Sequence, residues 1–137
     1  MDTTEQYIKM CEKAVEMQAL WKVTEGDFCI ERDVECRTMV GCIDDGQAVW
    51  DGDEKIIACW HRDCIWLPRQ DQLQEMMLEY TANSNITLME TLIFRIKGDG
   101  RDVYGKCCSM EQLWLAFVMK EKFNKVWTGE QWKTIST

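Results

Sequence analysis

Two well-marked helices with a glycine-containing segment between them constrain the fold of this 137-residue chain most. Pro68 has the preset φ that suits a first helical turn, and a core-facing stripe at helical spacing follows it: Leu73, Met76, Met77 and Tyr80. Ser109 and Gln112 have the spacing of a capping box, which satisfies free backbone donors at a helix start. The sequence therefore predicts one helix from Pro68 to near Asn83 and another from Ser109 to Phe123.

The segment between these helices reads as a hairpin. Gly98-Asp99-Gly100 is a turn-forming group, and it stands between two short candidate strands, Thr91–Lys97 and Asp102–Tyr104. The stripe that begins at Leu73 is expected to pack with Leu113, Trp114 and Phe117 against a sheet. Beyond the last helix, Gly129 is expected to end the C-terminal region, with Trp132 folded back as a lid.

The first half of the chain predicts one helix followed by strands. Thr3 and Gln6 have capping-box spacing, and apolar side chains then recur every three or four residues up to about residue 21. Asp45-Gly46 and Asp51-Gly52 mark hairpin turns of an antiparallel meander. The expected strands are Phe28–Ile30, Met39–Ile43, Ala48–Trp50, Ile56–Trp60 and Cys64–Leu67.

This order of elements predicts an α+β fold with a mostly antiparallel β-sheet covered by about three α-helices. The length suits a single domain over residues 1–137. No run of 18 apolar residues and no secretory signal is visible, so the expected location is the cytoplasm, without membrane association. In that compartment the eight cysteines are expected to remain thiols and to pack as small apolar residues.

Two groups of residues could carry chemistry. Cys59-x-His61-x-x-Cys64 offers zinc ligands, and Cys36 and Cys42 could complete a set of four. The spacing matches no paired-knuckle pattern, so we expect no metal, although the question stays open for Cys59, His61 and Cys64.

The second group is Cys107-Cys108, which precedes a helix start, where a thiol pKa can fall. It offers a cysteine nucleophile with His61 as base. Packing at the helix junction is the simpler interpretation. No phosphate-binding glycine loop or nucleophile elbow occurs, so we predict no catalytic residue, no cofactor and no enzyme activity.

Acidic residues are concentrated in one segment. Ten of them stand against two arginines between Glu25 and Glu54, an excess equal to the net charge of −8 for the whole chain. Such a field can steer a basic protein partner and disfavours direct nucleic-acid binding. The predicted acidic and aromatic binding surface consists of Asp44, Asp45, Trp50, Asp51, Asp53 and Glu54.

Residues 65–132 resemble small uncharacterised proteins encoded in phages and prophages of Gram-positive bacteria. The resemblance rests on Trp66-Leu67-Pro68-Arg69-Gln70-Asp71-Gln72-Leu73-Gln74, on the helix that begins at Ser109, and on Val126-Trp127-Thr128-Gly129-Glu130-Gln131-Trp132. It implies a fold similar to phage α-β-α sandwich domains and a mobile-element setting, and it brings no catalytic residues.

The predicted function is that of a non-enzymatic phage or prophage accessory protein that binds another macromolecule. Two alternatives stay open. One is an acidic mimic of nucleic acid that blocks a host DNA-binding protein, and the other is a cysteine-dependent enzyme. The oligomeric state and the identity of the partner do not follow from the sequence.

Overall fold

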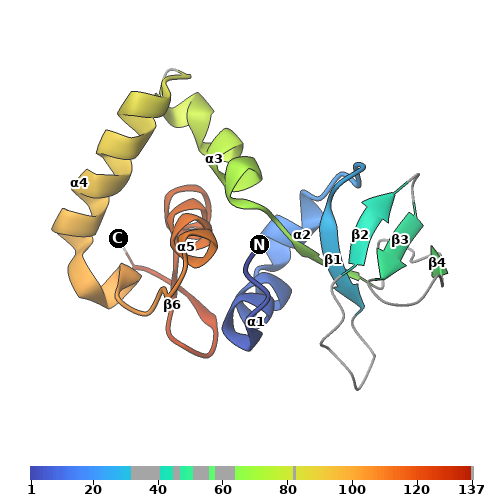
Figure 1. The fold of residues 1–137 in the computed structure, drawn as a ribbon. Coiled ribbons are helices and arrows are strands. Elements are labelled where there is room, and N and C mark those ends of the chain that lie inside the picture. The colour runs from blue at the N-terminus through green and yellow to red at the C-terminus, as the bar shows by residue number, and fades with distance from the viewer. Residues whose placement is uncertain (32–40, 45–46, 51–55, 58–63, 82, 137) are drawn as a thin grey trace. The chain divides into compact units, whose positions relative to one another are not determined.

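The computed structural model describes residues 1–31, 41–44, 47–50, 56–57, 64–81 and 83–136 (Figure 1). The chain divides into two compact units, which are described one at a time. The first unit is Thr3–Arg69, and the second is Gln70–Thr137 together with Met1–Asp2. The α+β class is confirmed. The single domain over residues 1–137 stays a prediction.

Two short helices begin the first unit. They are α1 (Glu5–Lys13) and α2 (Val15–Ala19). The Thr4 side chain accepts a hydrogen bond from the Tyr7 backbone N–H at 3.3 Å, so the cap is Thr4 instead of the predicted Thr3. Ala14 separates the two helices because its ψ of 66° lies outside the helical range. The prediction of one continuous helix over residues 3–21 is therefore wrong, because the helix is interrupted at Ala14.

A five-stranded antiparallel sheet follows in the order β4-β3-β2-β1-β5. Its strands are β1 (Phe28–Glu31), β2 (Gly41–Asp44), β3 (Gln47–Trp50), β4 (Ile56–Ile57) and β5 (Cys64–Leu67). The first four strands form the predicted meander, and β5 returns to pair with β1 on the other side. The predicted turns Asp45-Gly46 and Asp51-Gly52 lie outside the described residues.

Strand β5 is an edge of the sheet, and the helices of this unit cover it. The Gln18 side chain accepts from the Trp66 backbone N–H at 2.8 Å and donates to the Trp66 carbonyl at 3.0 Å. Tyr7 donates its hydroxyl to the Pro68 carbonyl at 2.5 Å. These bonds satisfy backbone groups that an open edge would offer to another chain.

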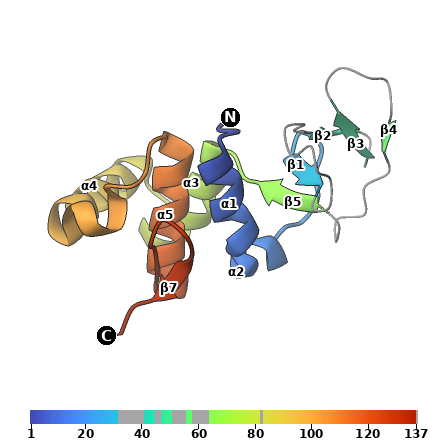
Figure 2. The same cartoon turned by 90° about the horizontal axis from the view of Figure 1, so that it is seen from below.

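The second unit is mainly helical. It contains α3 (Gln70–Leu78), a 3₁₀ turn η1 (Glu79–Thr81), α4 (Asn85–Tyr104) and α5 (Met110–Phe123). Helix α5 begins as predicted, because Ser109 accepts from the Gln112 backbone N–H at 3.1 Å. After α5, the strands β6 (Lys125–Trp127) and β7 (Trp132–Thr134) form a hairpin. Figure 2 shows this hairpin against α5.

The predicted stripe on α3 faces another helix instead of a sheet. Leu73 and Met77 are fully buried where α3 packs on α5, while Met76 is half-buried. From α5, Trp114 and Phe117 enter this core in an edge-to-face pair with ring centroids 5.8 Å apart. Within the described part of this unit the only strands are β6 and β7, so packing of the stripe against a large sheet is wrong.

The predicted hairpin over residues 91–104 is also wrong, since α4 runs through it as a 20-residue helix. The Ser84 hydroxyl oxygen accepts from the Thr87 backbone N–H at 3.3 Å, and the Ser84 carbonyl accepts from Leu88 at 2.9 Å. Leu88 and Leu92, four residues apart, are both buried. The burial of Leu88 and Leu92 stabilises the helix by more than the low helix propensity of Gly98-Asp99-Gly100 destabilises it, because tertiary packing outweighs intrinsic propensity.

The C-terminal segment forms a hairpin that folds Trp132 back onto Trp127. Gly129 takes a φ of +104°, which a glycine adopts without strain, and Thr128 N–H donates to the Gln131 carbonyl at 3.0 Å. Trp127 and Trp132 pair across the two strands with ring centroids 5.1 Å apart. The described residues thus hold five α-helices and two small antiparallel sheets, so the prediction of one sheet covered by about three helices is wrong.

No helix in the part of the chain that the structure describes is both long and apolar enough to cross a membrane.

Candidate binding surface

Of the six residues in the predicted acidic and aromatic surface, the structure describes the backbone of only two, Asp44 and Trp50. Asp44 stands opposite Gln47, and Trp50 stands opposite Gly41, so they occupy opposite ends of the β2–β3 ladder. Three strand positions separate these ends, about 10 Å along the strand. The backbone pairing therefore does not bring Asp44 and Trp50 together. Asp45, Asp51, Asp53 and Glu54 lie outside the described residues.

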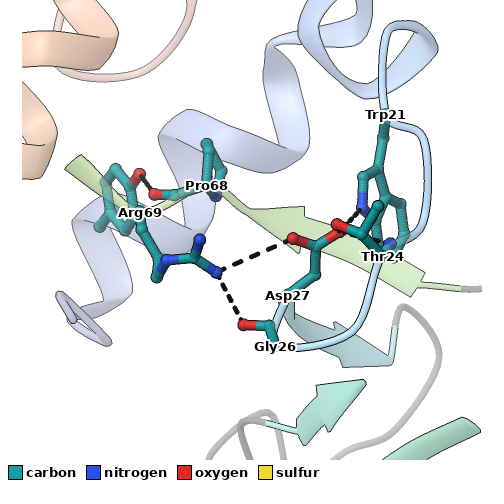
Figure 3. A network of polar contacts seen from close by, with 7 residues as sticks. Trp21, Thr24, Gly26, Asp27, Pro68 and Arg69 are labelled. Carbon is teal, nitrogen blue, oxygen red and sulfur yellow. Dashed lines mark hydrogen bonds and ion pairs between the residues drawn. The ribbon is translucent and has the colours of Figure 1, made fainter. Parts of the chain in front are cut away.

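Asp27, one of the ten acids in the acidic segment, is a structural residue. It is 1% exposed, and one carboxylate oxygen accepts from the Trp21 indole N–H at 2.8 Å and from the Thr24 backbone N–H at 2.9 Å. Arg69 lies 3.9 Å from the other oxygen and donates to the Gly26 carbonyl at 2.8 Å (Figure 3). A buried and fully engaged carboxylate is not available to a basic partner.

Five of the seven tryptophans belong to the core. Trp21, Trp66, Trp114, Trp127 and Trp132 are each at most 9% exposed. Their burial favours packing over an exposed aromatic patch as the reason for the high tryptophan content.

The cysteine groups do not form a described reactive site. Cys59 and His61 lie outside the described residues, and Cys64 is disulfide-bonded, so the expectation of a thiol is wrong there. Burial raises the pKa of Cys107 from 9.0 to about 11, with a further contribution from neighbouring Cys108. A nucleophile needs a lowered pKa, so the helix start at Ser109 does not activate this thiol.

The start of α5 carries a polar network that sequence reasoning missed. Asp2 is 7% exposed, and it accepts from the Ser109 hydroxyl at 2.5 Å and from the Gln112 side chain at 2.8 Å. The Gln112 side chain in turn accepts from the Cys108 backbone N–H at 2.9 Å. A carboxylate at a helix N-terminus is electrostatically favourable. The network therefore stabilises the start of α5, and its described groups satisfy one another.

Helix α4 presents an inner face that holds it to its neighbours. Leu88 and Leu92 are each 2% exposed, in a unit where α4 contacts α3, η1 and α5 (Figure 1). On the same side Arg95 forms an ion pair with Glu121 of α5, with Nε and Oε1 3.1 Å apart. The inner face is thus fixed by two apolar anchors and one charged contact.

The outer face of α4 is apolar and exposed. Ile86 is 75% exposed, Phe94 70%, Ile93 48% and Met89 40%. With about 100° of rotation per residue, these four side chains lie on one side of the helix, away from Leu88 and Leu92. Single exposed apolar residues are ordinary, but a contiguous group of them is typical of a contact surface. We name Ile86, Met89, Ile93 and Phe94 the outer apolar face and treat it as the candidate binding surface.

A sequence signal for this surface existed. Residues 86, 89 and 93 follow one helical stripe, and residues 88 and 92 follow another, so the segment carries two apolar helix faces. The glycines at positions 98 and 100 led to the hairpin prediction instead.

Comparison with known proteins adds no relative: no protein-family model, curated protein or solved structure matches this chain.

Proposed function

We propose that this protein works by binding another protein through the outer apolar face of α4, without catalysing a reaction. The observation that carries the proposal is the exposure of four large apolar side chains on one side of a helix whose opposite side is packed. Removing apolar surface from water contributes about 25 cal/mol per Å². An apolar helix face is one of the recurring surfaces by which proteins recognise each other.

The cysteine chemistry supports a non-enzymatic role. With its pKa raised to about 11 by burial, Cys107 is protonated at neutral pH and is a weak nucleophile. This disfavours the cysteine-dependent enzyme at this position.

The proposal extends to the phage or prophage setting of the protein and to its acidic segment. We propose a phage or prophage accessory role in the bacterial cytoplasm, supported by the resemblance of residues 65–132, within which the predicted hairpin over residues 91–104 is a helix. The acidic segment between Glu25 and Glu54 would speed the encounter with a basic partner that is distinct from the protein covering the outer apolar face. Asp27 takes no part in that steering, because it is buried.

Site-specific photo-crosslinking tests the proposal. A benzophenone amino acid is placed at Phe94, where it keeps the apolar character of the side chain, and at exposed Lys133 as a control outside α4. Irradiation with lysate of a Gram-positive host and with the purified chain should give protein adducts from position 94 and few from position 133. Adding Ile86→Asp should remove the adducts at position 94. Equal crosslinking at both positions, or none at position 94, would contradict a binding role for this face.

A further inference from the structure

Two opposite charges lie within the outer apolar face of α4. Glu90 and Lys97 are both exposed, and helical geometry places them within about 20° of each other around the helix axis. Ile93 lies on one side of the line that joins them, and Phe94 lies on the other. The face therefore combines an apolar centre with a negative end toward Glu90 and a positive end toward Lys97.

These two charges do not satisfy each other within one helix. Seven residues correspond to about 10 Å of rise along the axis, well beyond the 4 Å of an ion pair. A partner that covers the face must offer a positive group near Glu90, a negative group near Lys97 and apolar side chains between them.

A second α4 laid antiparallel across the first supplies that pattern. The twofold axis is perpendicular to both helices and lies level with the midpoint between Ile93 and Phe94. Rotation about it places Glu90 of each copy beside Lys97 of the other. It also brings Ile93 against Ile93 of the second copy, and Phe94 against Phe94 of the second copy. A parallel arrangement would instead oppose Glu90 to Glu90 and Lys97 to Lys97. Like charges at an interface are unfavourable.

We propose that a second copy of this chain covers the outer apolar face, as an antiparallel pair of α4 helices related by twofold symmetry. This inference rests on the proposed function, since it names the partner of the same surface. Such an isologous contact is the commonest way in which soluble proteins form oligomers. One helix face per copy is a small interface, so the dimer is expected to dissociate in the micromolar range.

Charge reversal in the purified full chain tests the proposal by analytical ultracentrifugation over a concentration series. Wild-type protein should show a monomer–dimer equilibrium. Glu90→Lys opposes lysine to lysine and Lys97→Glu opposes glutamate to glutamate, so each should raise the dissociation constant at least about tenfold. The variant that carries both changes should dimerise like the wild type, and an equimolar mixture of the two single variants should form a heterodimer.

Two matched controls make the same changes of charge away from the face. Asp102→Lys and Lys133→Glu alter exposed residues and should leave dimerisation unchanged. Circular dichroism of every variant reports whether the fold is retained. Failure of the double variant to recover would overturn the antiparallel pairing, even if both single variants were monomeric.

The two proposals can fail separately. A wild-type chain that stays monomeric up to high micromolar concentration overturns the second-copy proposal. If position 94 then still crosslinks to a different protein in lysate, the face is a binding surface for that protein. If position 94 gives no adduct either, the proposed function fails as well.

Discussion

At the scale of single residues, a large buried side chain makes a measurable contribution to the free energy of unfolding. Trp114 is fully buried and packs edge-to-face on Phe117. Trp114→Ala is expected to lower the free energy of unfolding by about 3–5 kcal/mol, because it removes apolar contacts and leaves a cavity. Chemical denaturation measures the change. Met110→Ala, at a 43% exposed position near the start of the same helix, is the control and should change stability by less than about 0.5 kcal/mol. Equal effects would place Trp114 outside the core.

Cys107 provides a pH-dependent residue-level test. Because burial raises its pKa from 9.0 to about 11, the folded state favours the neutral thiol. That preference stabilises the fold below pH 9.0 and is lost as the pH rises through about 11. Iodoacetamide at pH 8 should therefore modify Cys107 more slowly in folded than in denatured protein, as measured by peptide mass spectrometry. Equal rates in the two states would show that the thiol is not protected.

At the scale of elements, α4 is where tertiary packing overrides a local turn signal. Gly98 lies inside the helix, and a Cβ added there meets nothing within 4 Å. Gly98→Ala is expected to raise the free energy of unfolding by about 0.5–1 kcal/mol, because alanine loses less backbone entropy in a helix. A loss of stability would instead favour the hairpin that the Gly-Asp-Gly pattern predicts. Thermal and chemical denaturation distinguish the two results.

Gly129 is the matched control for this substitution. A Cβ there also meets nothing within 4 Å, but the backbone has a φ of +104°. Gly129→Ala should therefore destabilise the protein, since L-residues are strained in that conformation. The opposite signs at positions 98 and 129 would separate the effect of backbone conformation from that of side-chain space.

At the scale of the whole molecule, the cysteines report on the oxidation state of the chain. Cys11, Cys29, Cys107 and Cys108 are thiols, and Cys64 is disulfide-bonded. Each disulfide uses two of the eight cysteines, so thiol titration in denaturant without reductant should find six thiols for one disulfide or four for two. Titration after reduction should find eight. Eight thiols before reduction would contradict the disulfide. Stable disulfides are typical of oxidising compartments, so the count also bears on the proposed cytoplasmic location.

The sequence by itself determined the features that depend on neighbouring residues. Alternating apolar runs separated by turn residues predicted the meander from β1 to β4, and Ser109 with Gln112 predicted the start of α5. Pro68 correctly marked the approach to α3. These signals are local because a cap, a turn or a strand pattern acts within a few residues of the chain.

The tertiary structure alone decided the features that join distant residues. Asp27 is a structural carboxylate because Trp21, Thr24 and Arg69 surround it, and Gln18 covers an edge strand 48 positions away. Helix α4 forms because Leu88 and Leu92 are buried in the core and Arg95 forms an ion pair with Glu121. The outer apolar face then exists only because those contacts orient the helix. Burial and ion pairing depend on which segments meet in space, and no short-range pattern specifies that meeting.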